Sequence, residues 1–318
     1  MFRYALPSAQ TAEDSVRAFY CDHFVLPLPD GHRFPMEKYA RLRERVMKVP
    51  GVDLSVPPPA TDDELLRVHS EDYLDGVVRG SLTDNEVRRI GFPWSPQLVE
   101  RSRRSVGGTI QAARVALLEG AAVNLAGGTH HAFKGHGEGF CVFNDVAVAA
   151  LDVLSREPSL HLAVVDLDVH QGNGTARIFR DDDRVFTLSV HGEANYPFKK
   201  EESDVDIGLE DGATDEVFLD AVRSGLDSVL RTRPHLIFYV AGADAYEGDR
   251  LGRLKVTQAG LATRDDLVFE AAATNGVSVV TVMAGGYARD TDDTVSIHES
   301  SVRRASRYHH LQKSVGST

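Results

Sequence analysis

The sequence has few cysteines and no long apolar run, and these absences exclude two classes of protein. Only Cys21 and Cys141 occur among 318 residues, so a disulfide-rich secreted scaffold is excluded and a reducing cytoplasm is the expected location. No stretch of about 18 apolar residues occurs that could cross a membrane. The first ten residues also lack the basic and apolar regions of a secretory signal. We therefore expect neither a membrane span nor a secretory signal.

Basic residues are also fewer than acidic residues. The chain has 35 Lys and Arg against 47 Asp and Glu, which gives a net charge of −12. Such a surface repels phosphate backbones, so we expect no nucleic-acid partner. It tolerates cationic partners such as lysine-rich segments, although solubility alone is a sufficient reason for the charge. The 42% of hydrophobic residues is ordinary for a globular protein, and the length suits one large α/β domain or two small ones.

Beyond residue 120 the chain alternates apolar, β-branched runs with helical patterns. The runs predict strands at Ala121–Ala126, Leu162–Val169, Val185–Val190, Leu236–Ala241 and Val277–Met283. The patterns predict helices at Asp145–Arg156, Asp215–Arg231 and Arg264–Asn275. This alternation predicts a three-layer α/β/α sandwich with a mostly parallel central sheet. Upstream, the prolines of Val56-Pro57-Pro58-Pro59 predict a loop between two helical stretches.

Each of the five predicted strands runs into glycine, histidine, aspartate or tyrosine. In α/β sheets of this kind, ligands bind outside the carboxyl ends of the strands. A purely structural pattern would scatter these residue types over both ends of the strands, so the clustering predicts a functional site at one edge of the sheet. The segments are Gly127-Gly128-Thr129-His130-His131, Asp166-Leu167-Asp168-Val169-His170, Ser189-Val190-His191, Gly242-Ala243-Asp244 and Gly285-Gly286-Tyr287.

Asp168 and His170 are spaced as metal ligands. Residues two apart on a strand point to the same face, and one carboxylate with one imidazole makes a good pair of zinc ligands. A catalytic zinc needs a third protein ligand and an open position, and Asp244 at the end of another strand is the best candidate. By itself, however, Asp-x-His is also typical of a capped strand end.

His130, His131 and Tyr287 offer proton-transfer groups at the same edge. Successive side chains diverge, so the two histidines cannot readily chelate one metal, but each can exchange a proton near neutral pH. Two glycines before Tyr287 let the backbone approach closely and bring the hydroxyl into a site. The structural alternative for His130 and His131 is a pair of surface or hydrogen-bonded loop histidines. For Tyr287 it is a tight turn with a packed aromatic ring.

Taken together, these segments resemble the histone deacetylase family, which has the arginase-like fold. The resemblance extends from about His69 to Tyr287, with its motifs in the family's order. The stretches that carry it are Gly127–His131, Gly139-Phe140-Cys141-Val142-Phe143-Asn144-Asp145, Asp166–Gly174 and Gly285–Tyr287. The stretch Glu247–Gly252, together with His170–Gly174, resembles the class IV branch most closely.

The resemblance implies a role for each matching residue. Asp168, His170 and Asp244 match the zinc ligands, and His131 matches the general base. His130 matches its neighbour, which a buried carboxylate holds, here Asp166, and Tyr287 matches the donor to the developing oxyanion. Gly139 matches the carbonyl that accepts from the substrate amide, and Phe140 and Tyr196 match the aromatic walls of a narrow channel. Asp166, Asp168, His170 and Ser189 fall where family members hold a structural potassium ion (K⁺).

One position departs from many relatives. Asn173 stands where class I members place an aspartate behind the second histidine. A neutral amide raises the pKa of a histidine less than a carboxylate does. The division of proton transfer between His130 and His131 therefore stays open.

The resemblance implies a single catalytic domain over residues 1–318. Its expected activity is zinc-dependent (Zn²⁺) removal of acyl groups from lysine side chains of proteins or peptides. Class IV relatives are associated with long fatty acyl groups, so we expect faster turnover of lysine carrying eight or more acyl carbons than of acetyl-lysine. The alternative substrate is a small acylated amine such as an acylpolyamine, which an acidic gate of Glu138 and Glu193 would favour. An inactive acyl-lysine-binding module is disfavoured, because the predicted metal ligands and the tyrosine are all present. A dimanganese enzyme is disfavoured, because the additional carboxylates that would bridge two metals are not evident.

Overall fold

Eight parallel strands form one sheet in the computed structural model, which describes residues 15–316 and the side chains as far as Leu311. Their order across the sheet is β2-β1-β3-β8-β7-β4-β5-β6. The first ten residues, in which the sequence predicts no secretory signal, lie outside the described residues. The strands are β1 (Val16–Phe19), β2 (Val52–Ser55), β3 (Ala121–Asn124), β4 (Leu162–Asp166), β5 (Val185–Gly192), β6 (Val205–Leu209), β7 (Leu236–Val240) and β8 (Ser278–Val282).

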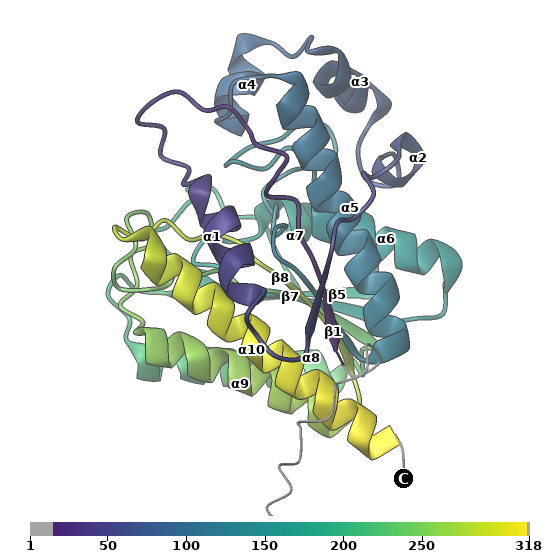
Figure 1. The fold of residues 1–318 in the computed structure, drawn as a ribbon, viewed down its shortest axis with the longest axis vertical. Helices are drawn as coiled ribbons and strands as arrows, with labels where there is room; N and C mark the ends of the chain where they lie inside the picture. Colours follow the sequence, from purple (N-terminus) through teal and green to yellow (C-terminus); the bar gives the residue numbers. More distant parts are fainter. Residues whose placement is uncertain (1–14, 317–318) are drawn as a thin grey trace, which may run out of the picture.

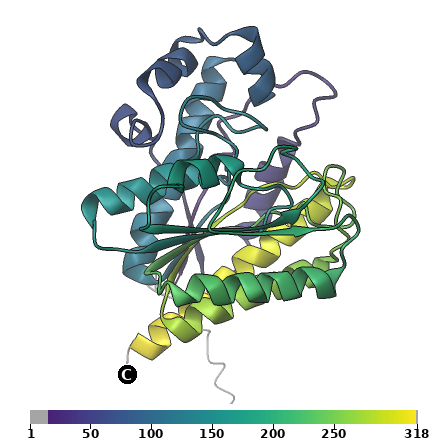
Figure 2. The same ribbon diagram turned by 180° about the vertical axis from the view of Figure 1, so that it is seen from behind.

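Helices cover both faces of the sheet, as Figure 1 and the reverse view in Figure 2 show. One face carries α1 (Glu37–Val46), α8 (Asp215–Arg231), α9 (Gln258–Asn275) and α10 (Thr291–Gly316). The other carries α5 (Pro96–Glu119), α6 (Asp145–Arg156) and α7 (Asn173–Phe179), and the short helices α2 (Asp62–Leu65), α3 (Glu71–Arg79) and α4 (Asp84–Ile90) add to this side. The predicted three-layer α/β/α sandwich is therefore confirmed.

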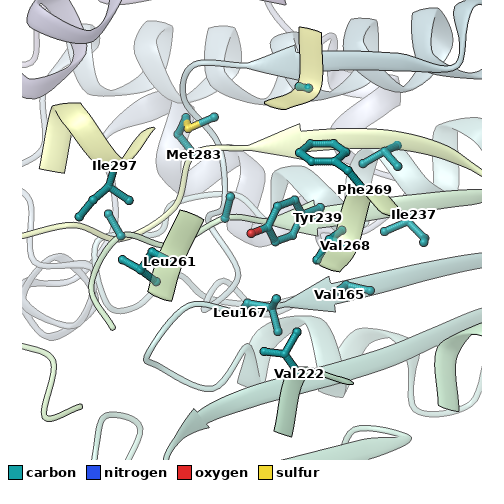
Figure 3. Packing of buried hydrophobic residues seen from close by; sticks show 14 of the residues in the cluster. Val165, Leu167, Val222, Ile237, Tyr239, Leu261, Val268, Phe269, Met283 and Ile297 are labelled. Atoms are coloured by element: carbon teal, nitrogen blue, oxygen red, sulfur yellow. The ribbon is translucent and has the colours of Figure 1, made fainter. Parts of the chain in front are cut away.

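The sheet separates two hydrophobic cores. Along β7, Ile237 and Tyr239 pack into the core under α8, α9 and α10, whereas Leu236 and Phe238 pack into the core under α5 and α6. Figure 3 shows part of the first core, where Tyr239 lies among side chains from α9 and neighbouring strands. Because successive side chains point to opposite faces, a strand covered on both sides is apolar at every position. This explains why the central strands are continuous apolar runs in the sequence.

The predicted elements are mostly present. Helices α6 and α8 have the predicted bounds, and Asn144 caps α6 by accepting from the backbone N–H of Ala147 at 3.0 Å. Helix α9 begins at Gln258, six residues before the predicted start, because Thr257 caps it there. No helix in the described part of the chain is long and apolar enough to cross a membrane.

The environment of the proline cluster is a correction. The loop around Val56–Pro59 is present, but the element before it is strand β2, not a helix. Strand β2 pairs along its length with β1, which lies more than 30 residues earlier in the sequence. Such pairing depends on a distant partner, so the local pattern did not indicate it. Strand β6 and the long helices α5 and α10 were likewise not predicted from the sequence.

Candidate metal centre and active site

Three buried side chains converge where β4 and β7 end. Asp168 and His170 lie in the loop after β4, and Asp244 lies in the loop after β7. His170 Nδ1 is 2.9 Å from Asp168 Oδ1 and 3.2 Å from Asp244 Oδ2. One donor atom from each residue lies within 4.8 Å of the others, and no further His, Cys, Asp or Glu cluster of this kind occurs among the described residues. The structure thus brings together the three residues that the sequence predicts as metal ligands.

The chemistry of this cluster fits a cation. Burial lowers the pKa of His170, but the two carboxylates outweigh burial and raise it to about 10. Burial and the neighbouring Asp168 raise the pKa of Asp244, whose Oδ2 is buried without a hydrogen bond. Two adjacent buried carboxylates repel each other unless a positive charge lies between them. Two carboxylates and one imidazole are also the donor types of open catalytic zinc sites.

The backbone of Gly285 lies directly against this cluster. Its backbone N–H donates to Asp168 Oδ2 at 2.7 Å. A Cβ atom at this position would collide with Asp244 Oδ2. Only glycine lets the loop after β8 approach the two carboxylates this closely, which explains the first glycine of the Gly-Gly-Tyr motif.

The two histidines are held by different partners. His130 Nδ1 donates to Asp166 Oδ2 at 2.6 Å, and His131 Nδ1 donates to Asn173 Oδ1 at 2.7 Å. Asn173 Nδ2 in turn donates to Glu138 Oε1 at 2.8 Å. Since a carboxylate can only accept, Glu138 sets the orientation of the Asn173 amide and makes its oxygen face the histidine. The proton of neutral His131 therefore sits on Nδ1, and Nε2 is left as a base.

The same partners give the two histidine rings different pKa values, although the ring centroids lie only 4.1 Å apart. Burial lowers the pKa of His130, but Asp166 and Asp168 outweigh it and raise the pKa to about 9. Burial and the neighbouring His130 charge lower the pKa of His131 well below its ordinary value. At neutral pH His130 is thus the cation and His131 the neutral ring. This arrangement suits His131 to accept a proton.

The predicted wall and oxyanion residues surround the same space. The Phe140 and Tyr287 ring centroids lie 6.1 Å apart, and the Tyr196 ring packs edge-on against His131 at 5.0 Å. Gly139 and Phe140 both have positive φ angles, 56° and 65°, which turn the chain sharply at this wall. Burial raises the pKa of Tyr287 well above its ordinary value. Its hydroxyl therefore keeps its proton and can donate a hydrogen bond.

A cavity of about 610 Å³ leads from the surface to this site, and His131, His170 and Tyr287 are among its lining residues. Beyond it lies a chamber of only about 50 Å³, whose lining includes both histidines of the pair and Asp168. The site therefore consists of a wide mouth and a small, partly open pocket beside the metal cluster.

Sequence reasoning missed two residues that position this edge. Lys38, on α1, is buried, and its Nζ donates to the carbonyl oxygens of Ala284 and Gly286 at 3.3 Å each. Asp249 Oδ2 accepts from the backbone N–H of Tyr287 at 2.6 Å. Nothing in the local sequence links Lys38 to a loop almost 250 residues away. Asp249 lies within Glu247–Gly252, the stretch that resembles the class IV branch, and this is the sequence signal that points to it.

The predicted potassium site stays a prediction. Asp166 and Ser189 occupy paired positions on β4 and β5, and both side chains are buried. Ser189 Oγ lies 3.0 Å from His191 Nδ1, so this hydroxyl already has a protein partner.

A parallel α/β sandwich with a carboxylate–imidazole cluster and a histidine pair at its strand ends defines a recognisable class. Residues 32–301 match the histone deacetylase domain, which is most of the chain. The protein belongs to the histone deacetylase family, of the arginase/deacetylase superfamily. Its assignment to the class IV branch stays a prediction.

Individual relatives range from bacteria to plants. An uncharacterized protein of Picosynechococcus sp. is 44% identical over 293 residues, which are 91% of this chain and 97% of that protein. Histone deacetylase 2 of Arabidopsis thaliana is 32% identical over 246 residues, 74% of this chain and 63% of that protein. The acetoin utilization protein AcuC of Bacillus subtilis is 32% identical over 228 residues, 64% of this chain and 59% of that protein. The aligned segments thus span less than two thirds of the length of the last two relatives.

Solved structures show the same fold. The crystal structure of an HDAC homolog from Aquifex aeolicus aligns with a TM-score of 0.79 and 23% identity, covering 94% of this chain and 89% of that one. The HD domain of HDA15 aligns with a TM-score of 0.76 and 21% identity, and the alignment covers 91% of this chain and 88% of that one. At these identities the likeness shows the fold alone.

Proposed function

We propose that this protein is a zinc-dependent hydrolase that removes an acyl group from the ε-amine of lysine in a protein or peptide, and that one catalytic domain carries the activity. One observation supports this above all. A buried cluster of two carboxylates and an imidazole lies in one narrow space with a neutral histidine and a protonated tyrosine. Membership of the histone deacetylase family agrees with it. A cytoplasmic location stays a prediction from the two cysteines, both of which are free and buried.

The metal-ligand set is Asp168, His170 and Asp244. Zinc held there would act as a Lewis acid and lower the pKa of water from about 16 toward 7. The residues around the cluster then divide the remaining work. His131, with Nδ1 directed at Asn173, presents Nε2 as the base that takes a proton from the attacking water.

Hydrolysis forms a carbon–oxygen bond at the acyl carbon and breaks the carbon–nitrogen bond to lysine. The Tyr287 hydroxyl donates to the oxygen that becomes negative as water adds, a contribution of about 3–4 kcal/mol for one such donor. The proton taken by His131 is delivered to the leaving nitrogen, so that the products are a carboxylate and a free amine. His130, held as a cation by Asp166, stabilises the negative charge that develops beside it.

The small volume of the pocket beside the metal cluster favours a short acyl group. Its volume of about 50 Å³ corresponds to the space of roughly three to five water molecules, at about 10–15 Å³ each. An acetyl methyl needs no more than this. A second pocket, which shares Phe34, Gly127 and Phe140 with the first, is equally small at about 50 Å³, so a chain of eight or more carbons would require the surrounding aromatic side chains to move. We therefore propose acetyl-lysine as the preferred substrate, in place of the long acyl chain expected from the class IV resemblance.

The test is turnover of peptides that carry acetyl-, octanoyl- or myristoyl-lysine in one sequence, with product masses measured after incubation with zinc-loaded protein. We expect acetyl-lysine to have the highest kcat/KM, with activity lost on removal of the metal and restored by zinc. Activity that is unaffected by a chelator and by Asp168→Ala would reject the metal mechanism. Faster turnover of octanoyl-lysine would reject the short-acyl proposal alone.

A further inference from the structure

The mouth of the active-site cavity is strongly basic. Its lining contains five arginines and no aspartate or glutamate, although the whole chain has a net charge of −12. The arginines come from three separate segments: Arg33 in the loop before α1, Arg88 and Arg89 at the end of α4, and Arg250 and Arg253 in the loop after β7. A positive rim on an acidic protein is a local feature that the overall composition hides.

Most of this charge is not neutralised within the protein. Arg253 pairs with Asp211 at 3.1 Å, and Arg250 Nε donates to the carbonyl of Tyr287 at 3.0 Å. Arg33, Arg88 and Arg89 are exposed, and none has a carboxylate within 4.0 Å among the described residues.

Of the acidic residues near these arginines in the sequence, Asp30 and Asp84 are exposed to solvent, whereas Glu86 and Glu138 already have partners. Glu86 accepts from the backbone and hydroxyl of Thr83 in the capping box that begins α4. Glu138 accepts from Asn173 and lies 3.6 Å from His136, and its side chain is largely buried. Arg88 donates to Asn85 Oδ1, and Thr83 and, to a smaller extent, Arg89 lower the pKa of Glu86. None of the three arginines forms a salt bridge with a described residue, so their guanidinium groups can pair with a ligand that enters the cavity.

Such a rim selects its substrate by charge. Like charges around a cleft with low-dielectric walls concentrate the field and attract ligands of the opposite sign. An acylpolyamine or a lysine-rich segment would bring positive charge against these arginines. The acidic gate that an acylpolyamine substrate requires is not part of this lining.

We propose that the substrate is an acylated lysine flanked by aspartate or glutamate residues, whose carboxylates pair with Arg33, Arg88 and Arg89; this proposal rests on the proposed lysine deacylation. The Phe198 side chain is 87% exposed and lines the same mouth, which offers an apolar contact beside the charges. The cavity narrows to a pocket of about 50 Å³, and the chain as a whole has a net charge of −12. These two features favour a short acidic peptide segment over a long polyanion such as RNA.

The first test compares three labelled peptides with one central acetyl-lysine and flanks of Glu, Gln or Lys. Their affinity for the full-length protein is measured by fluorescence anisotropy, with and without zinc. At 0.1 M salt we expect the Glu peptide to bind about tenfold more tightly than the Lys peptide, the equivalent of about 1.4 kcal/mol. At 1 M salt the Debye length falls from about 10 Å to about 3 Å, so the preference should largely disappear.

The second test uses paired variants. Arg33→Gln combined with Arg88→Gln should abolish most of the preference for Glu flanks. The matched control is Arg231→Gln combined with Arg307→Gln, two exposed arginines on α8 and α10. Arg231 ends α8 just before β7 begins, and Arg307 precedes Tyr308, which contacts Val277 before β8, so both lie where strands start. The control pair should leave the preference unchanged.

The outcomes separate the two proposals. Hydrolysis of all three peptides at equal kcat/KM and equal affinity would overturn the charge selectivity and leave the deacylase proposal intact. Tighter binding of Glu flanks without hydrolysis of any peptide would refute the deacylase proposal and support the basic mouth as an acidic-peptide site. Equal loss in both variant pairs, absence of binding by every peptide, or displacement of the Glu peptide by a short RNA at lower concentration would overturn the inference.

Discussion

Replacing Tyr287 with phenylalanine removes one hydroxyl group and leaves the ring in place. The ring lies against Phe34 and Phe140 at centroid distances of 6.2 Å and 6.1 Å, and Lys38 Nζ lies 5.3 Å from its centroid. A phenyl ring preserves all of these contacts. The hydroxyl donates no hydrogen bond to the residues that the structure describes, so its removal leaves no buried partner unsatisfied.

The effect on stability should therefore be within about 0.5 kcal/mol. The effect on catalysis should be much larger, because the hydroxyl is the side-chain donor available to the developing oxyanion. Loss of one such donor costs about 2.7–4 kcal/mol, which corresponds to a fall in kcat of about 100- to 1000-fold. The assay measures kcat and KM on an acetyl-lysine peptide, together with zinc content and the thermal unfolding midpoint.

Tyr246→Phe is the matched control. It also removes one hydroxyl, which lies 3.4 Å from Asp293 Oδ2 and outside the cavity lining. This variant should keep nearly full activity. The role assigned to Tyr287 would be refuted if its phenylalanine variant kept kcat within about threefold of the unchanged protein. It would also be refuted if the loss of activity were matched by a loss of zinc, since the defect would then lie in the metal site.

Three further changes test other parts of the site and fold. Asp244→Ala removes one of three predicted ligands, so we expect less than a tenth of the bound zinc, measured by elemental analysis, and no measurable turnover. His131→Ala should lower kcat at least 100-fold, because no other neutral imidazole is positioned as a base; a milder effect than that of His130→Ala would reverse the assignment. Burial lowers the pKa of His69 from 6.5 to about 4, so unfolding binds a proton between these values and stability falls as pH drops through this window. Between pH 7 and pH 4.5, the free energy of unfolding measured by chemical denaturation should fall less for His69→Gln than for the unchanged protein. An equal fall in both proteins would contradict a buried, neutral His69.

The sequence was sufficient for the central part of the fold because the central strands are buried on both faces. Burial on both sides makes a strand such as β7 an unbroken apolar run, and a covering helix such as α8 carries its own caps and periodicity. Strands at the edge of the sheet lack this signal. Strand β2 is only partly buried, and its partner β1 is distant in the chain, so the local pattern predicts a helix where the structure has a strand.

The sequence by itself also indicated the residues at the centre of the candidate site, since parallel strands place their carboxyl ends at one edge and the motifs mark those ends. Only the tertiary structure decided how these residues act on one another. The link from Glu138 through Asn173 to His131 fixes a proton position, and it joins loops that no local pattern connects. Likewise, no local pattern indicates that arginines from three separate segments line the mouth of the cavity. Charge composition is a sum over the whole chain, whereas the field at a cavity depends on which few side chains the fold brings together.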